Sequence, residues 1–468
     1  MHPSPYSGSW YPARPSDLET LLAAASEKSR RRTGPFLPPD ALAYVVPHAG
    51  PAYSGVVASA VYRAIEQQRP ERIVVLAFPH HGGLRGVASP EVEAISTPLG
   101  RVEIDPALGF PRVPEEEVCD HSFEIQLPFL QRAAPAARVA PLYIGRMTAA
   151  ERRAAADRLA AAWEPGTVFL ASSDFTHYGP DFGFVPFPAS HDTGDLLRDL
   201  DEESIEAASS LDAELFLETL RENGSTVCGT GPIALLLDIL QRLGGGGIYQ
   251  AELDYQTSGE ITGDFRHSVS YAALGYYRRQ AFELPEPDHA ALLDSAEETL
   301  RRLRATGVRR PVPARGGSAA LQARCGAFVS LHRGDELLGC IGNCWRKLPL
   351  AQHVPELVLA AALDDPRFRP AVKTQGPIDI EISVLTPFRR VRGVEGFQLG
   401  KHGALLRLAG RTGLLLPQVA AGYEWTAEEF WQHTARKCML GRHAWRDPQA
   451  RLFVFEAQVL ARAAAAEA

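Results

Sequence analysis

Cysteine is scarce in this 468-residue chain, which has only six, at positions 119, 228, 325, 340, 344 and 438. Thiols spaced this widely do not form the disulfide framework of a small secreted protein, and a reducing compartment would keep them reduced. Each cysteine is therefore expected to be a small core residue, a metal ligand or a reactive thiol, and its neighbours must decide between these roles.

Long apolar runs and an excess of basic residues are also missing. No segment approaches the roughly 18 uninterrupted apolar residues of a membrane span, and the N-terminal MHPSPYSGSWYP lacks the basic and apolar regions of a signal peptide. We therefore expect no membrane partner and a cytoplasmic location. The net charge of -8 argues against a general binder of nucleic acid.

The motifs of several common cofactors are absent too. The chain has no P-loop and no G-x-G-x-x-G coupled to a strand. Cys340 and Cys344 form C-x-x-x-C, but a radical-SAM cluster needs a further cysteine where Lys347 stands. The composition, with 45% apolar and 22% charged residues, is that of a globular protein, and the length predicts two or three domains.

Three apolar runs in the first half of the chain end in residues that can bind a metal or carry a proton. They are residues 44–46 followed by His48, residues 72–78 followed by His80 and His81, and residues 167–175, which end around Asp174 and His177. The amphipathic stretch 55–67 between the first two runs predicts a β-α-β unit whose strands are parallel neighbours. Because the carboxyl ends of parallel strands meet at one edge of a sheet, we expect these residues to converge, although two unrelated loop histidines explain the first two runs equally well.

Two further stretches carry candidate site residues. Residues 120–133 are expected to form a helix with His121 and Glu124 on one face, a spacing that lets the two share a pocket but that surface pairs also show. Cys228 lies on a glycine-flanked turn before a helix that begins near Pro232. A helix N-terminus lowers the pKa of a nearby thiol, which favours metal binding or nucleophilic attack; a small buried core cysteine is the alternative.

Seven blocks stand in order across residues 1–278: GSWYP at 8–12, PHAG at 47–50 with AYSG after it, PHH at 79–81, HSFEIQLPF at 121–129, SSDFTHYG at 172–179, CGTGPI at 228–233 and SVSYAALG at 268–275. Together they resemble the MEMO family. The resemblance implies an α/β domain with the class III extradiol dioxygenase (LigB-type) fold, a sheet flanked by helices. It also implies a mononuclear metal site, with iron as the expected metal and His48, His80 and Cys228 as its ligands.

The resemblance places Asp174, His177 and His121 near this site, and these residues with Glu124 are expected to orient ligands or move protons. Two imidazoles and a thiolate suit Fe(II), Zn(II) or Cu, and three protein ligands leave positions open for water, oxygen or substrate. The extradiol dioxygenases use two histidines and a carboxylate instead. A cysteine ligand therefore argues against ring cleavage, since the fold does not carry the reaction with it.

Residues 279–288 are charged and punctuated by proline, and we expect them to be a linker. A helix and a hairpin of strands 327–331 and 336–341 are expected next. Five blocks stand in order there: GAFVSLHRGDELLGCIGNCWRKLPL at 326–350, AALDDPRFRP at 361–370, IDIEISVLTP at 378–387, GLLLPQVA at 413–420 and WTAEEFWQHTARKCML at 425–440. They resemble the AMMECR1 family, which implies an α+β domain over residues 289–461, ahead of an alanine-rich tail at 462–468.

The most characteristic AMMECR1 block, Leu-Arg-Gly-Cys-Ile-Gly, falls on residues 337–342, where Leu338 replaces the arginine and weakens any anion-binding role of that position. Cys340 is retained and is the first candidate for a catalytic residue, while a buried hairpin cysteine explains it equally well. Four polar residues of this half are expected to line a cleft: Asp365, Arg367, Glu381 and Gln418. For Asp365 and Arg367, the alternative is a turn closed by a salt bridge.

Members of both families also exist as separate proteins, often encoded beside a radical-SAM enzyme in the AmmeMemoRadiSam system, so the resemblance implies a radical-SAM partner. Fusion raises the effective concentration of the domains to about millimolar, which favours a shared substrate. We expect an iron-dependent redox enzyme for a small organic molecule, aromatic ones included, with the AMMECR1-like domain binding or releasing it or acting as a second catalyst. The alternatives are a non-catalytic scaffold that binds metal or a partner, and a zinc-dependent hydrolase with Glu124 or Asp174 as base.

Overall fold

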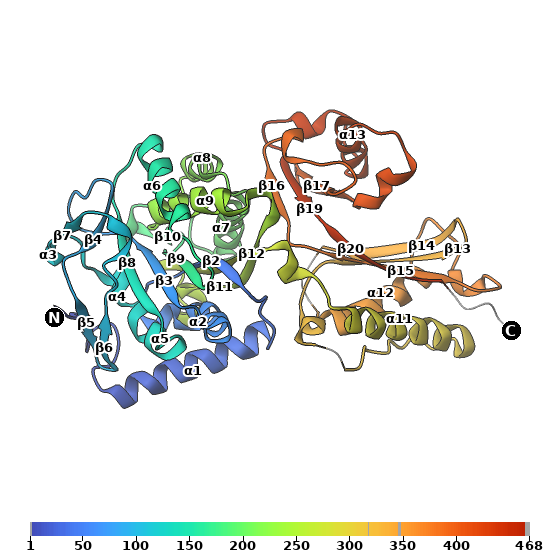
Figure 1. Cartoon of the computed structure of the whole chain (residues 1–468). Helices are drawn as coiled ribbons and strands as arrows, with labels where there is room; N and C mark the ends of the chain where they lie inside the picture. Colours follow the sequence, from blue (N-terminus) through green and yellow to red (C-terminus); the bar gives the residue numbers. More distant parts are fainter. Residues whose placement is uncertain (1, 317, 345–347, 464–468) are drawn as a thin grey trace. The chain divides into compact units, whose positions relative to one another are not determined.

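The computed structural model describes residues 2–316, 318–344 and 348–463. The chain forms two compact units, Met1–Ala281 and Phe282–Ala468 (Figure 1). Lys347 and most of the predicted alanine-rich tail, residues 464–468, lie outside the described residues. Within the described ranges, every helix is too short or too polar to cross a membrane.

The first unit contains two sheets and ten α-helices among the described residues. Its strands are β1 (His2–Pro3), β2 (Ala41–Val46), β3 (Arg72–Ala77), β4 (Val87–Pro90), β5 (Ala94–Thr97), β6 (Gly100–Glu103), β7 (Arg112–Val113), β8 (Arg138–Ile144), β9 (Thr167–Ser172), β10 (His177–Tyr178), β11 (Ile248–Thr257) and β12 (Ser268–Arg278). Its helices are α1 (Pro15–Thr33), α2 (Pro51–Gln68), α3 (Glu115–Val118), α4 (His121–Glu124), α5 (Gln126–Ala133), α6 (Ala149–Ala161), α7 (Thr193–Ser209), α8 (Ala213–Asn223), α9 (Thr230–Leu243) and α10 (Ser258–Thr262).

The main sheet has the strand order β10-β12-β2-β9-β3-β8-β4-β7, with β11 paired to β12, and a small sheet has the order β1-β5-β6. On one side α2 packs on β2, β11 and β12, and α1 and α5 pack on α2. On the other side α9 packs on β2, β9 and β3, with α6 and α8 behind it (Figure 1). The predicted α/β class, a sheet flanked by helices, is confirmed.

The central strands are buried on both faces, which explains their unbroken apolar sequences. Val45, Leu76 and Leu170 are all 0% exposed. Strands covered by helices on both sides do not need the alternation of apolar and polar residues that a half-exposed sheet shows. The continuous runs of the sequence therefore fold into the middle of the sheet, and polar residues appear only where these strands end.

The prediction that β2 and β3 are neighbours is wrong, although their parallel direction is correct. Strand β9 lies between them and pairs in parallel with both. The crossover through α2 thus skips one strand position, which the later apolar run fills. As a result, Ser172 at the end of β9 lies between the strand ends that carry His48 and His80.

The prediction of one helix over residues 120–133 is also wrong, because two helices, α4 and α5, meet at Ile125. Pro128 has no backbone N–H and cannot donate to the Glu124 carbonyl one turn earlier, so a continuous ladder is broken there. The first of the two helices is capped by Asp120, whose side chain accepts a hydrogen bond from the Ser122 amide.

The second unit is built from two four-stranded sheets and three α-helices within the described residues. Its strands are β13 (Ala327–Arg333), β14 (Glu336–Asn343), β15 (Asp379–Leu385), β16 (Arg389–Val391), β17 (Gly403–Leu408), β18 (Arg411–Leu415), β19 (Arg451–Phe455) and β20 (Ala457–Arg462). Its helices are α11 (Glu286–Thr306), α12 (Leu350–Leu363) and α13 (Ala427–Lys437). The α+β class predicted for this half is confirmed.

The sheets of the second unit have the orders β14-β13-β15-β20 and β16-β19-β17-β18. The predicted hairpin is present, with Arg333 paired to Glu336 at its turn. Helix α11 begins at Glu286, within the segment expected to be a linker. A first helical turn accommodates proline and acidic residues well, so the composition that indicated a linker also fits a helix N-terminus.

The N-terminus of α9 comes very close to the end of β9. A Cβ atom at Gly229 would lie 2.4 Å from the Ser173 Cβ and 2.6 Å from the Ser172 carbonyl oxygen. The Gly229 amide donates a hydrogen bond to the Ser173 hydroxyl at 2.9 Å. Glycine at this position therefore allows the turn that carries Cys228 to reach the end of the strand.

We predict that Gly229→Ala pushes this turn away from β9 and lowers the free energy of unfolding of the first unit by about 1–3 kcal/mol, the usual effect of overpacking. Hydrogen exchange of the β9 and α9 amides measures the change. Gly247→Ala is the matched control, because no atom lies within 4 Å of the Cβ it would add. Equal effects of the two substitutions would contradict the packing argument.

Candidate metal centre

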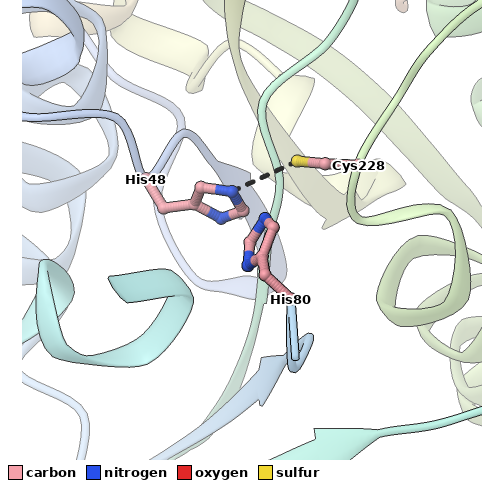
Figure 2. Close-up of side chains that lie close together, drawn as sticks. All are labelled: His48, His80 and Cys228. Carbon is pink, nitrogen blue, oxygen red and sulfur yellow. Dashed lines mark hydrogen bonds between the residues drawn. The ribbon is translucent and has the colours of Figure 1, made fainter. Parts of the chain in front are cut away.

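His48 follows β2 and is 1% exposed. Its Nδ1 lies 2.9 Å from the Ser172 hydroxyl oxygen. Ser172 donates its only hydroxyl proton to the Ser122 carbonyl, so it accepts from the imidazole. His48 therefore carries its ring proton on Nδ1 and keeps a free lone pair on Nε2. That nitrogen lies 3.1 Å from the Cys228 Sγ (Figure 2).

His80 follows β3, and a carboxylate fixes its ring in the same tautomer. Its Nδ1 and its backbone nitrogen both lie 2.7 Å from Asp120 Oδ2, which accepts from both. Burial by itself would raise the pKa of Asp120, but hydrogen bonds from His80 and Ser122 hold it below its ordinary value. The Nε2 of His80 is left for another partner. His81, the other histidine at this strand end, is exposed and lies outside the cluster.

Cys228 stands just before α9, and its Sγ accepts a hydrogen bond from the Asp174 amide at 3.2 Å. The prediction that the helix end lowers the pKa of the Cys228 thiol is wrong as long as no cation is bound beside it. Burial and the Asp174 carboxylate raise the pKa of Cys228, and the amides of Asp174 and Gly229 offset them only in part. A bound cation would supply the positive charge that a thiolate needs here.

The three side chains converge on one point. One ring nitrogen of each histidine and the Cys228 Sγ lie within 4.8 Å of one another, and the two imidazole centroids are 5.3 Å apart (Figure 2). A thiol 3.1 Å from an imidazole nitrogen is also the geometry of a nucleophile and its base. The imidazole of His80 also directs its Nε2 to this point. A second imidazole favours a metal site over a nucleophile with its base.

His121, the first residue of α4, joins the cluster by stacking. Its ring lies 4.0 Å from that of His80 and 4.6 Å from that of Trp10, between centroids. Burial and the neighbouring His48 and His80 lower the pKa of His121 to about 3. The ring is therefore neutral near pH 7 and adds no positive charge that would repel a metal ion.

Asp174 and His177, which follow β9, lie on the Cys228 side of the cluster. Asp174 Oδ1 accepts hydrogen bonds from the His48 and Ala49 amides at 2.8 and 3.3 Å, and burial raises its pKa. His177 Nδ1 lies 2.9 Å from the Phe175 carbonyl oxygen and so acts as a donor, which leaves Nε2 free to exchange a proton.

Glu124 points elsewhere. Its Oε1 lies 3.0 Å from the Nε2 of His2, and its side chain is fully buried. His121 at the start of α4 stacks on His80, whereas Glu124 at its end contacts His2 of β1. The expectation that His121 and Glu124 share one pocket therefore does not match their hydrogen bonds and ring contacts.

Sequence reasoning missed the residues that set the tautomers, above all Ser172 and Asp120. Gln126, whose side-chain amide donates to the Ser172 hydroxyl at 3.0 Å, was missed as well. A signal was present, because Asp120 directly precedes His121 and the other two lie inside the blocks SSDFTHYG and HSFEIQLPF. The search for titratable side chains at strand ends passed over hydroxyl and amide groups.

In the second unit, the salt-bridged turn is present. Arg367 donates to Asp365 through two nitrogens, at 2.9 and 2.7 Å, and to the Cys340 carbonyl at 2.8 Å. Asp365 in turn accepts from the Cys340 amide at 2.8 Å. The pair thus closes the turn against the backbone of β14. Leu338, which stands where the family motif has arginine, is 7% exposed.

Cys340, Glu381 and Gln418 do come together on one face of the sheet. The strand register places Cys340 opposite Ser330, and Ser330 opposite Glu381. The Ser330 hydroxyl donates to the Cys340 Sγ at 3.2 Å, and Gln418 donates to Glu381 at 3.1 Å. The row joins a thiol, a hydroxyl and a carboxylate across three strands.

The Asp365–Arg367 pair predicts a pH dependence of stability. Hydrogen bonds from Arg367 hold the pKa of Asp365 down at about 2, against the effect of burial. Since an unfolded aspartate titrates near about 3.9, the pair stabilises the native state above about pH 4, and this contribution is lost as the pH falls to about 2.

We expect Asp365→Asn to lower the free energy of unfolding of the second unit by up to about 2 kcal/mol at pH 7 and to flatten its pH dependence between about pH 4 and 2. Denaturant unfolding at several pH values measures both. Asp335→Asn, in the exposed hairpin turn, is the matched control. An unchanged pH profile in Asp365→Asn would argue against the role given to the salt bridge.

Known proteins match the chain in two segments. A family model described as Memo-like protein matches residues 3–275, and one described as AMMECR1 matches residues 293–460. A MEMO1 family protein of Methanosarcina barkeri is 35% identical over 280 residues, covering 57% of this chain and 97% of the relative. The memo-1 homolog of Caenorhabditis elegans is 27% identical over 285 residues, with coverage of 57% and 80%.

Among solved structures, an uncharacterised protein from Pyrococcus horikoshii is 29% identical, with a TM-score of 0.34. The match covers 36% of this chain and 88% of that protein. The two family models follow the same order as the two compact units. The chain belongs to the Memo-like protein family and carries an AMMECR1 domain fused behind its Memo-like unit.

Proposed function

We propose that the Memo-like unit binds a single iron ion at His48, His80 and Cys228 and uses it for redox chemistry on a small organic molecule. The observation that carries this proposal is the state of the two imidazoles. Both have their Nδ1 protons committed to neighbours, and His48 directs its bare Nε2 at the Cys228 Sγ. A metal ion is the group that two unprotonated imidazole nitrogens and one thiol bind together.

The donor set fits iron. Two nitrogen donors and one sulfur donor suit a borderline first-row metal, and three protein ligands leave positions for substrate. Asp120 and Ser172 would keep the rings oriented, because a hydrogen-bonded imidazole cannot turn away from the metal. When bound, iron would supply one-electron chemistry and a Lewis acid, and the protein would supply orientation and proton transfer.

The residues around the centre have separate roles in this proposal. His177 would exchange a proton through its free Nε2, and Asp174 would hold the His48 backbone and balance the charge of the centre. His121 and Trp10 would offer their rings to a planar substrate, since Trp10 is 39% exposed beside the stacked histidines. Glu124 takes no part, because its hydrogen bond goes to His2.

The AMMECR1 unit would handle the same molecule in this scheme. Its row of Cys340, Ser330 and Glu381 presents polar groups that a small molecule can contact. A radical-SAM enzyme is the proposed partner, because members of both families are often encoded beside one; the chain itself does not have the cysteine spacing for such a cluster. Zinc hydrolysis is the second candidate, since the same three donors also suit Zn²⁺.

The first test is metal content. Protein purified without oxygen is expected to hold about one iron per chain. The double variant His48→Ala, Cys228→Ser is expected to lose the iron, because each substitution removes one donor atom. Elemental analysis and Mössbauer spectroscopy measure the metal and its oxidation state. A double variant with His81→Ala and Cys344→Ser removes the same side-chain types elsewhere and should keep the iron.

Each other outcome of this test has a meaning. Stoichiometric zinc lost in the double variant would favour the hydrolase. Absence of metal, or metal that the double variant retains, would refute the site and leave a non-catalytic scaffold as the better description of the unit.

The hydrogen bond between Asp120 and His80 makes a further prediction. Asp120→Asn should weaken iron binding by about 10–100-fold, because an amide holds the imidazole less firmly and makes it less basic. Competition with a chelator of known affinity, in the absence of oxygen, measures the change. Asp181→Asn is the matched control, since its side chain is 82% exposed; an equal loss in both variants would contradict the role of Asp120.

A further inference from the structure

A second group of metal-binding side chains meets in the Memo-like unit, apart from the ligands described above. His2 lies on β1, Cys119 follows α3 and Glu124 lies in α4. Each of these residues has a donor atom within 4.8 Å of the other two. The three residues thus come from a strand, a loop and a helix, and β1 is held in place by its pairing with β5.

The carboxylate of Glu124 points to a missing partner. Its side chain is 0% exposed, and Oε1 lies 3.0 Å from the Nε2 of His2. Oε2 is buried and has no hydrogen-bond partner among the residues that the structure describes. A buried carboxylate oxygen without a donor is costly, and a bound ion is one of the groups that commonly satisfies it.

The charges around His2 also leave room for a cation. His2 Nδ1 lies 3.2 Å from Glu115 Oε1, so one ring stands between two carboxylates. The hydrogen bonds that His2 donates to Glu124 and Glu115 raise its pKa against the effect of burial. Each ring nitrogen faces a carboxylate oxygen, which only accepts, so both nitrogens carry a proton and this imidazolium offsets only one of the two negative charges. Burial and the charge of Glu124 raise the pKa of Cys119 to about 12, so this neighbour is a neutral thiol.

We propose that His2, Cys119 and Glu124 form a second metal site, which takes a borderline divalent ion such as Zn²⁺. Nitrogen, sulfur and oxygen donors are the set that zinc binds in proteins. The ion would bind His2 through Nε2, Cys119 through Sγ and Glu124 through a carboxylate oxygen, with the fourth position open to water. Glu115 would keep its hydrogen bond to Nδ1 and orient the ring.

Binding exchanges the ion for two protons. The His2 imidazolium gives up the Nε2 proton, and the Cys119 thiol gives up its own, both to solvent. Two positive charges thus replace two protons, and the net charge of the group is unchanged. An occupied site would tie β1 to α4, whose first residue, His121, stacks on His80 in the first centre.

The test uses the full chain with the first centre removed by His48→Ala and Cys228→Ser, so that its result does not depend on the proposed iron site. Titration with Co²⁺ and with Zn²⁺ without oxygen is expected to show about one ion per chain and about two protons released. Co²⁺ should also give the near-ultraviolet absorption of a thiolate ligand. Adding Cys119→Ser should abolish this absorption and weaken binding by at least about 100-fold.

Glu117→Gln provides the matched control. It removes an exposed carboxylate from α3, the short helix that directly precedes Cys119, and should leave the titration unchanged. Circular dichroism checks the folding of each variant, and Glu124→Gln serves if Cys119→Ser does not fold. Absence of Co²⁺ and Zn²⁺ binding, or a thiolate absorption that survives Cys119→Ser, would overturn the proposal. The contact of His2 with Glu124 would then be an ion pair only.

Discussion

The candidate metal centre depends on the hydrogen bonds made by the last residue of β9 and by the two residues that follow it. Ser172 fixes the tautomer of His48, the Ser173 hydroxyl holds the Gly229 amide, and Asp174 binds the His48 backbone and the Cys228 thiol. These contacts exist because β9 lies between β2 and β3. A direct pairing of β2 with β3 would leave no strand end to hold both the imidazole and the thiol.

Desolvation outweighs the helix dipole at Cys228. The field at a helix end is worth about 0.3–1 kcal/mol and falls off within a turn, whereas burial of a thiolate beside a carboxylate costs more. At Cys119, burial and the charge of Glu124 likewise raise the thiol pKa. The sequence shows that Cys228 precedes a helix, but the Asp174 carboxylate beside it follows a strand far away in the chain.

The sequence predicted the features that depend on local pattern and missed those that depend on strand order. The apolar runs, the hairpin and the convergence of His48, His80 and Cys228 followed from strand ends and from resemblance. The position of β9 could not be predicted, because a crossover that skips one strand shows the same strand–helix–strand pattern in the sequence as a crossover that does not. Glu124 was assigned to the wrong neighbour because its partner, His2, comes from the far N-terminal strand β1, which the spacing within residues 120–133 does not reveal.

Two chain segments of the second unit lie side by side where they pass from one sheet to the other. Strands β15 and β16 are joined through residues 386–388, and β19 and β20 through Glu456. The Thr386 amide donates to the Glu456 carbonyl, and the Glu456 amide donates to the Thr386 hydroxyl. Because β15 pairs with β20 and β16 with β19, the segments form one antiparallel ribbon through both sheets. Because two hydrogen-bonded segments connect the sheets, a rotation of one sheet against the other would have to break the hydrogen bonds between Thr386 and Glu456.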